Sequence, residues 1–211
     1  MRGFLIVCLL AAASSIAHAD VFAEAVGGGS FPIGDSNWTN KVDKSPDVGV
    51  RAGWTMHDGV GAMVQADWTP LNPYVAPTAN LGATTIPGYT YTDAMQRFRV
   101  LADATFQMHL TPWLVARARA GVGVDIMHET VAFSGIHATE VDPNIAVEVG
   151  GGLWWSLARS RVAIGGELAL PFSNHSRASG LPPAIPLDRL FPEQYASWDI
   201  ELELGVRVTL H

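Results

Sequence analysis

Cysteine is almost absent from this sequence, and its single cysteine, Cys8, lies within the first 19 residues. Those residues place Arg2 before an apolar run that starts at Phe4, and they finish on small residues. This is the pattern of a secretory signal peptide, here cleaved after Ala19. Residues 20–211 would then hold no cysteine, which excludes any disulfide bond from the mature chain.

Long apolar runs and positive charge are also scarce. After the signal peptide no stretch approaches the roughly 20 apolar residues of a transmembrane helix, so a helical membrane protein is excluded. The chain has 13 Lys and Arg against 20 Asp and Glu, and loss of Arg2 lowers its net charge from −7 to −8. This acidic net charge gives no indication of nucleic-acid binding. Neither an H-E-x-x-H motif nor a Cys/His spacing occurs, so no metal or other cofactor is expected.

What the sequence does contain is a regular alternation of apolar and polar residues. It is clearest in WDIELELGVRVTLH, residues 198–211, where the even positions are all apolar and the odd positions are glycine or polar. A period of two is that of a β-strand, whose successive side chains point to opposite faces. The run is also long enough for the ~9–11 tilted residues with which a strand crosses a bilayer. Because the chain ends on this strand, we expect it to be paired in a closed sheet.

Residues 20–211 have the length of one domain. They divide into segments in which apolar and polar residues alternate, and the connections between these segments are alternately long and short. Eight segments are predicted as strands: 21–30, 48–56, 60–69, 96–108, 114–126, 145–157, 162–172 and 198–211. Long connections are expected at 31–46, 70–92, 127–143 and 173–196, with tight turns between the others. This pattern predicts an all-β, eight-stranded antiparallel up-and-down transmembrane β-barrel. Its short periplasmic turns would lie with both termini at one end and its long extracellular loops at the other.

The large aromatic residues of the apolar face fall near the strand ends. Trp68, Phe98, Phe172 and Trp198 would lie near the loops, and Trp54, Phe106 and Trp155 near the turns. Two such girdles are typical of a barrel in a bilayer, where aromatic rings lie at the membrane interfaces. Alternation alone leaves a second fold open, a soluble lipocalin-like barrel with the apolar face and its aromatics inside.

Three segments resemble a known superfamily. They are SFPIGD after the glycine-rich first strand, GGGLWW in the sixth and ELELGVRV in the last. With the signal peptide, they resemble the small eight-stranded outer-membrane β-barrels (OmpA/OmpX-like) of Gram-negative bacteria, over the whole mature chain. The resemblance implies a monomeric, integral protein of the cell envelope. It would contact outer-membrane lipids and lipopolysaccharide, be inserted by the barrel-assembly machinery, and have no enzymatic activity. These barrels usually end on Phe or Trp, whereas this sequence ends on Leu210 and His211.

Charged residues of both signs occupy the polar face of the strands. An eight-stranded lumen is only wide enough to be filled by side chains, and an isolated buried ion costs several kcal/mol. Acids and arginines on opposite walls are therefore expected to pair and plug the lumen. A narrow ion path is the alternative, with Arg97/Arg99 and Arg117/Arg119 as an anion site. The predicted inward-facing residues are Glu24, Arg51, Asp67, Arg97, Arg99, Asp103, Arg117, Arg119, Asp125, Glu148, Glu167, Asp199, Glu201, Glu203 and Arg207.

The connections suggest two further hypotheses. His175 followed by Ser176 resembles the His-x-Ser-Asn region of outer-membrane lipid A deacylases, although the spacer and the Asn are missing. Loop aromatics on a rigid scaffold often serve recognition; here they are Trp38, Tyr74, Tyr89, Tyr91 and Tyr195. Solvated turns or loops are expected for His57, His109, His128, His137 and His175. The sequence thus predicts a structural or surface-recognition role, with a narrow pore or a deacylase-like acyl-ester hydrolase as alternatives.

Overall fold

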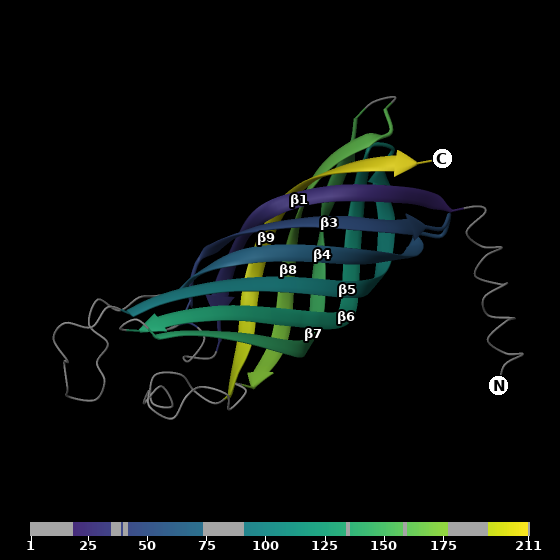
Figure 1. Ribbon diagram of the computed structural model, residues 1–211. Coiled ribbons are helices and arrows are strands. Elements are labelled where there is room, and N and C mark those ends of the chain that lie inside the picture. Colours follow the sequence, from purple (N-terminus) through teal and green to yellow (C-terminus); the bar gives the residue numbers. More distant parts are fainter. Residues whose placement is uncertain are drawn as a thin grey trace, which may run out of the picture.

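The protein is a closed antiparallel β-barrel of eight strands (Figure 1). The computed structural model describes residues 19–34, 39, 42–73, 91–133, 136–157, 160–176 and 194–210. The barrel strands are β1 (Asp20–Ile33), β3 (Ser45–Thr55), β4 (Val60–Pro73), β5 (Tyr91–Thr111), β6 (Leu114–Phe133), β7 (Ile136–Ser156), β8 (Val162–Ser176) and β9 (Gln194–Leu210). A two-residue strand, β2 (Val42–Asp43), pairs with β4 beyond the loop end of the β3–β4 ladder. Within the described ranges, no helix has the length and apolarity that crossing a membrane requires.

Each barrel strand pairs with its neighbours in the chain, and the first pairs with the last. The β1–β9 ladder runs from Val21 opposite Leu210 to Ile33 opposite Trp198. Apart from loop-end stretches such as residues 91–94 of β5 and 136–145 of β7, which pair along one edge, every strand therefore has a partner on both edges. The backbone N–H and C=O groups of the barrel wall are thus satisfied without water, as a membrane-spanning sheet requires. The predicted up-and-down topology and even strand number are confirmed.

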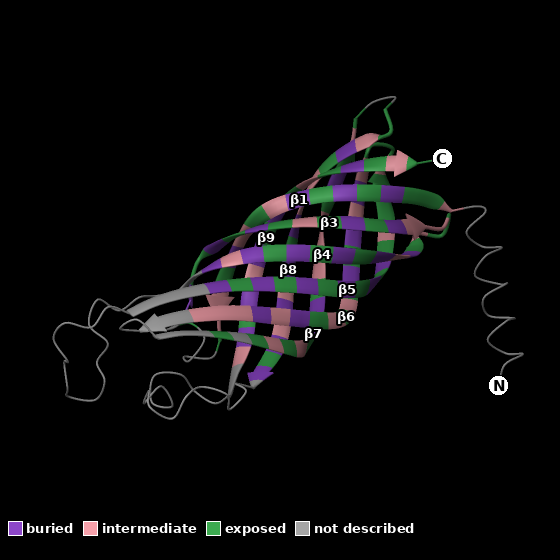
Figure 2. Cartoon of the chain, viewed as in Figure 1, coloured by how far each residue is buried: buried purple, intermediate pink, exposed green. Residues whose placement is uncertain are grey.

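Buried and exposed residues alternate along the strands (Figure 2), and the buried residues are mostly polar whereas the exposed ones are mostly apolar. Along β9, Glu201 and Glu203 are buried, whereas Leu202 and Leu204 are 50% and 75% exposed. A soluble barrel would place the apolar face inside and the polar face outside. The lipocalin-like alternative is therefore wrong, because its core would have to be the apolar face.

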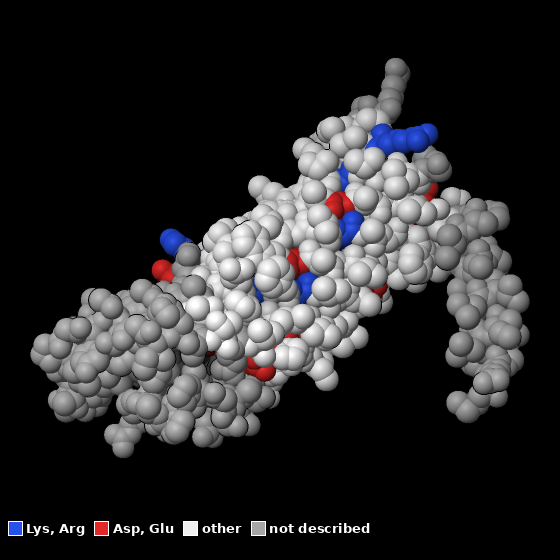
Figure 3. All heavy atoms as spheres, in the orientation of Figure 1, with Lys and Arg blue, Asp and Glu red and all other residues white. Residues whose placement is uncertain are grey.

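The outer wall carries almost no charge between its two ends. Among the described residues, the exposed charged side chains lie at or beyond the strand ends: Asp20, Asp43, Lys44, Asp58 and Arg161. Most of the described surface seen in Figure 3 is accordingly uncharged. An apolar belt between two polar rims is the surface that a bilayer accommodates.

One predicted connection is wrong. Residues 127–143 were expected to form a loop, but β6 and β7 continue as paired arms as far as Phe133 and Ile136. Polar residues such as Glu129 and Asp142 interrupt the apolar alternation, which hid the strands. The backbone pairing continues nevertheless, and β-branched residues in these arms favour it. His128 consequently lies half-buried in β6 instead of in a loop. The exposed His57 and His109 lie at the turn end as predicted.

The aromatic residues predicted as girdles lie on the outer face. Trp68 pairs with Phe98 across β4 and β5, with ring centroids 6.5 Å apart. Phe172 and Trp198 pair across β8 and β9, with centroids 4.7 Å apart. Near the turns, the centroid of Trp155 lies 4.5 Å from that of Trp113, while Trp54 is half-exposed and Phe106 exposed. Their contact with the membrane interfaces stays a prediction.

The outward position of Leu204 gives a test of which face meets lipid. Leu204→Arg puts a charge in the middle of the apolar belt and should cost roughly 2–4 kcal/mol of stability in a bilayer. Leu210→Arg makes the same change on the same face at the end of β9 and should cost about 0–1 kcal/mol. Urea unfolding in lipid vesicles, followed by the gel mobility of unboiled samples, measures both. Equal losses at the two positions would contradict a membrane-spanning belt.

Candidate functional site

The lumen holds the largest group of functional side chains. All fifteen charged residues predicted to face inward are buried there, and they are joined by Asp47. Asp47 was missed because the second strand was predicted to start at Val48, whereas β3 starts at Ser45. The described part of the lumen thus buries six arginines and ten carboxylates. The arginines are Arg51, Arg97, Arg99, Arg117, Arg119 and Arg207; the acids are Glu24, Asp47, Asp67, Asp103, Asp125, Glu148, Glu167, Asp199, Glu201 and Glu203.

Arginines of β5 reach the wall directly opposite. Around the barrel β9 lies four strands from β5, so the two face each other across the lumen. Arg97 pairs with Asp199, and its Nη2 donates to Glu201 at 2.9 Å. The Nη2 of Arg99 donates to the other oxygen of Glu201 at 2.5 Å. One carboxylate thus joins two arginines across the full width of the barrel.

A second level of the lumen joins β6 to β1, which also face each other. Arg117 donates to both oxygens of Glu24, at 2.6 and 2.8 Å, and pairs with Glu167 on β8. Arg207 shares Glu24, at 2.6 Å. The buried indole of Trp154 contacts both arginines, with its ring centroid 4.8 Å from the guanidinium of Arg117 and 4.5 Å from that of Arg207. Cation–π contact and ion pairing therefore stabilise the same level.

Between these levels, Arg51 and Arg119 form the centre of the network. Arg51 donates to both oxygens of Glu203, at 2.7 and 2.5 Å, and to Glu167 at 3.1 Å. Arg119 pairs with Glu148 and Glu167 and donates to Gln65 at 2.7 Å. Shared carboxylates make the network continuous from β3 to β9. Removal of one member would leave several charges buried without a partner.

At the loop end, His175 lies inside the barrel and is 0% exposed. The expectation that it is solvated is wrong, because β8 continues to Ser176 and position 175 shares the inward parity of Glu167 and Ser173. Its Nε2 lies 2.8 Å from the hydroxyl of Ser173 and its Nδ1 3.2 Å from Asp142. The alternation of inward and outward residues continues past Phe172, and this continuation could have predicted that His175 faces the lumen.

Several predicted features lie outside what the structure describes. These are the signal peptide before residue 19, the loop residues Trp38, Tyr74 and Tyr89, and the chain end His211. Tyr91, His137, Ser176 and Tyr195 belong to strands, but their side chains are not described. The resemblance of His175 and Ser176 to the lipid A deacylase region therefore stays a prediction as far as Ser176 is concerned.

The arginine–carboxylate network gives a stability prediction. Arg117→Met keeps much of the side chain's volume but leaves Glu24 and Glu167 with fewer partners, so it should cost about 3–5 kcal/mol. Arg161→Met removes an exposed arginine at the turn end and should change the urea midpoint little. Equilibrium urea unfolding of the refolded protein measures both variants. If the two unfold at the same urea concentration, the network does not stabilise the barrel.

Solved structures of outer-membrane proteins resemble this fold. Neisserial surface protein A matches with a TM-score of 0.57 at 14% sequence identity, covering 92% of this chain and 97% of that protein. A major outer membrane protein from Thermus thermophilus matches with a TM-score of 0.61 at 14% identity, covering 91% and 99%. No protein-family model matches the chain, and no curated protein matches its sequence significantly. The chain has the fold of a small transmembrane outer-membrane β-barrel.

Proposed function

We propose that the protein is an integral outer-membrane barrel with a structural or surface-recognition role, and that its lumen does not conduct ions. The pairing of arginines with carboxylates between opposite strands carries this proposal. The pairs Arg97–Glu201 and Arg117–Glu24 span the barrel at two heights, with Arg51 and Arg119 between them. Eight strands enclose too little space for such pairs and a water-filled path together.

The turn end of the barrel supports the same proposal. A cavity of about 540 Å³ opens there, and Phe22, Gln107, Trp154 and Arg207 are among the residues that line it. Arg207 in turn bonds to Glu24 and Gln107, which tie it to two walls. An ion entering from this end would meet Trp154 and the Arg117–Glu24 pair. To pass, it would have to separate a buried ion pair, which is unfavourable by several kcal/mol.

The outer surface suggests the partners. The apolar belt would contact outer-membrane lipids and lipopolysaccharide, after insertion by the barrel-assembly machinery. Within the barrel wall each strand pairs with a neighbour on both sides, and the described stretches that pair on one side only lie at the loop end, so we expect a monomer. The loops would present recognition residues on a rigid scaffold.

Planar-bilayer recordings test the closed lumen. The refolded wild-type protein should give no conductance steps, because the ion pairs occupy the cross-section. A pore would instead give steps whose size changes in Arg117→Ala or Glu203→Ala but not in Leu202→Ala, which alters the outer face only. Conductance with that dependence would overturn the proposal and favour the narrow ion path.

Acyl-ester hydrolysis is the second candidate, and one observation favours it. Ser173, His175 and Asp142 are hydrogen-bonded in the order of a Ser-His-Asp catalytic triad. However, the Ser173 hydroxyl is buried and also lies 2.7 Å from Asp125 and 2.6 Å from the hydroxyl of Ser197. We therefore propose that this network fastens β8 to β6, β7 and β9, and that it does not attack an ester.

A fluorophosphonate probe separates the two roles. Such probes label an activated serine, so the wild-type protein refolded in detergent should remain unlabelled. It should also release no fatty acid from lipid A. Labelling that disappears in Ser173→Ala and His175→Ala, with the folded gel mobility retained, would identify a hydrolase.

A further inference from the structure

The charges buried in the lumen do not balance. Among the described residues, ten buried carboxylates face six buried arginines, which with every carboxylate ionised leaves an excess of four negative charges. His175 could supply one positive charge at the loop end, where it contacts Asp142 and Asp125. An uncompensated charge away from water is strongly unfavourable. The lumen therefore has reason to hold a cation that is not part of the chain.

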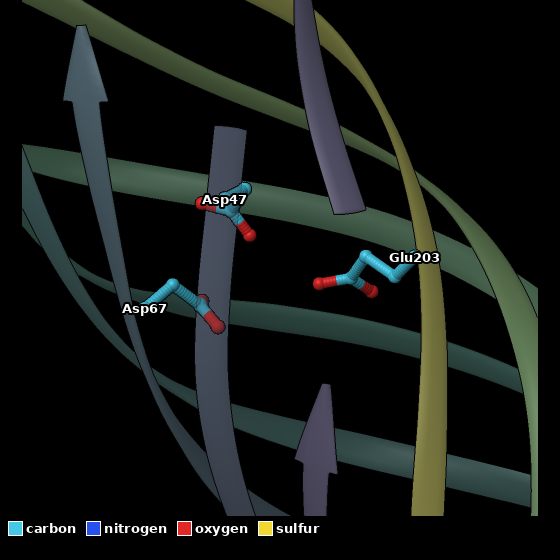
Figure 4. A group of neighbouring side chains, drawn as sticks. All are labelled: Asp47, Asp67 and Glu203. Atoms are coloured by element: carbon cyan, nitrogen blue, oxygen red, sulfur yellow. The ribbon is translucent and has the colours of Figure 1, made fainter. Parts of the chain in front are cut away.

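Three carboxylates come together where such a cation could bind. Asp47 on β3, Asp67 on β4 and Glu203 on β9 turn toward one another inside the barrel (Figure 4). One oxygen of each lies within 4.8 Å of the other two, and all three residues are buried. Like charges at this separation repel, so their convergence needs compensation.

Asp67 shows that the compensation within the chain is incomplete. It is 3% exposed, yet neither of its carboxylate oxygens accepts a hydrogen bond from any described residue. The closest guanidinium nitrogen recorded, Nη2 of Arg99, is 3.7 Å away and donates to Glu201 instead. A buried carboxylate with both oxygens free is rare in native proteins and calls for a ligand or ordered water.

The carboxylates of Asp47 and Glu203 are held in place by hydrogen bonds, and their oxygens can still accept further ligands. The hydroxyl of Thr69 donates to Oδ1 of Asp47 at 2.5 Å, while Oδ2 of Asp47 has no partner among the described residues. Arg51 fixes Glu203, whose oxygens can still accept on their remaining lone pairs. Two fixed carboxylates and one free carboxylate form a preorganised oxygen site.

Gly49 provides the space that this arrangement requires. It pairs with Asp67 across β3 and β4, and a Cβ at position 49 would clash with Oδ1 of Asp67, at less than 3.0 Å. Any other residue would push the Asp67 carboxylate away from the position it takes in the cluster. Glycine at position 49 therefore keeps the three carboxylates together.

We propose that Asp47, Asp67 and Glu203 bind one Ca²⁺ ion in the lumen. Ca²⁺ takes six to eight oxygen ligands at about 2.3–2.6 Å in flexible geometry, whereas Mg²⁺ demands near-ideal octahedral geometry and usually keeps several waters. Three protein carboxylates whose oxygens lie within 4.8 Å of one another therefore suit Ca²⁺ better. Water would complete the coordination. The ion removes half of the excess charge and links β3, β4 and β9, whether or not the lumen conducts.

Calorimetric titration of CaCl₂ into the refolded, chelator-treated full-length mature protein tests the site. We expect one Ca²⁺ per chain. At a free Ca²⁺ concentration of about 100 times Kd, the ratio of folded to unfolded protein in urea should rise about 100-fold over that in chelator. Asp67→Asn should lose both the binding heat and the Ca²⁺-dependent shift, even if removal of a buried charge makes it more stable in chelator.

Asp103→Asn is the matched control. Asp103 is also a buried lumen aspartate whose two oxygens lack hydrogen-bond partners, but it lies outside the cluster, so its variant should bind Ca²⁺ as the wild type does. If Asp67→Asn does not fold, Asp47→Asn replaces it. Gly49→Ala provides a further check, because it keeps all three carboxylates but displaces that of Asp67. Absence of binding to the wild type, or equal binding to Asp67→Asn and Asp103→Asn, would overturn the proposal.

Discussion

The structure depends on ion pairing across a lumen that is too narrow to hold much water. Because the outer wall of the barrel is apolar, the charged side chains of the strands have to lie inside, except at the strand ends. Arginines on β3, β5 and β6 reach carboxylates on β1, β8 and β9, so opposite walls are joined and not only adjacent strands. Such pairs are weak evidence of net stability, but they fix which strands face each other and at what height.

The alternation of residues predicts which side of the wall each side chain occupies, because a period of two leaves only two choices. It therefore placed Glu201 and Leu204 correctly without any knowledge of their partners. It failed where the predicted strands were too short. Asp47 and His175 lie just beyond the predicted ends of β3 and β8, and both face the lumen. The pairing of Arg117 with Glu24 could not be predicted. The two residues are 93 positions apart, and their contact depends on the stagger between their strands.

Trp154 shows a different limit of the sequence. GGGLWW puts Trp154 and Trp155 on opposite faces, and only the outward Trp155 was given a role. The inward indole lies against Gly165 of β8 and Gly205 of β9: a Cβ on either would come within 3.0 Å of its ring. Its Nε1 donates to Glu167 at 2.8 Å. Space for a large residue in this lumen thus comes from glycines on two other strands, which the pattern around Trp154 does not reveal.

The pairing of β1 with β9 sets the order in which this protein can be completed. Glu24 and Arg207, which meet at that seam, are 183 residues apart. Until the last strand arrives, β1 and the most recent strand each present an unpaired edge, which readily pairs with other chains. Contacts between the two ends of a chain also form slowly, because the entropy of closing the intervening loop has to be overcome first. Until β9 pairs with β1, the sheet of such a chain is open and its edges can pair with other chains. The pairing of β9 with β1 then covers both edges in one step.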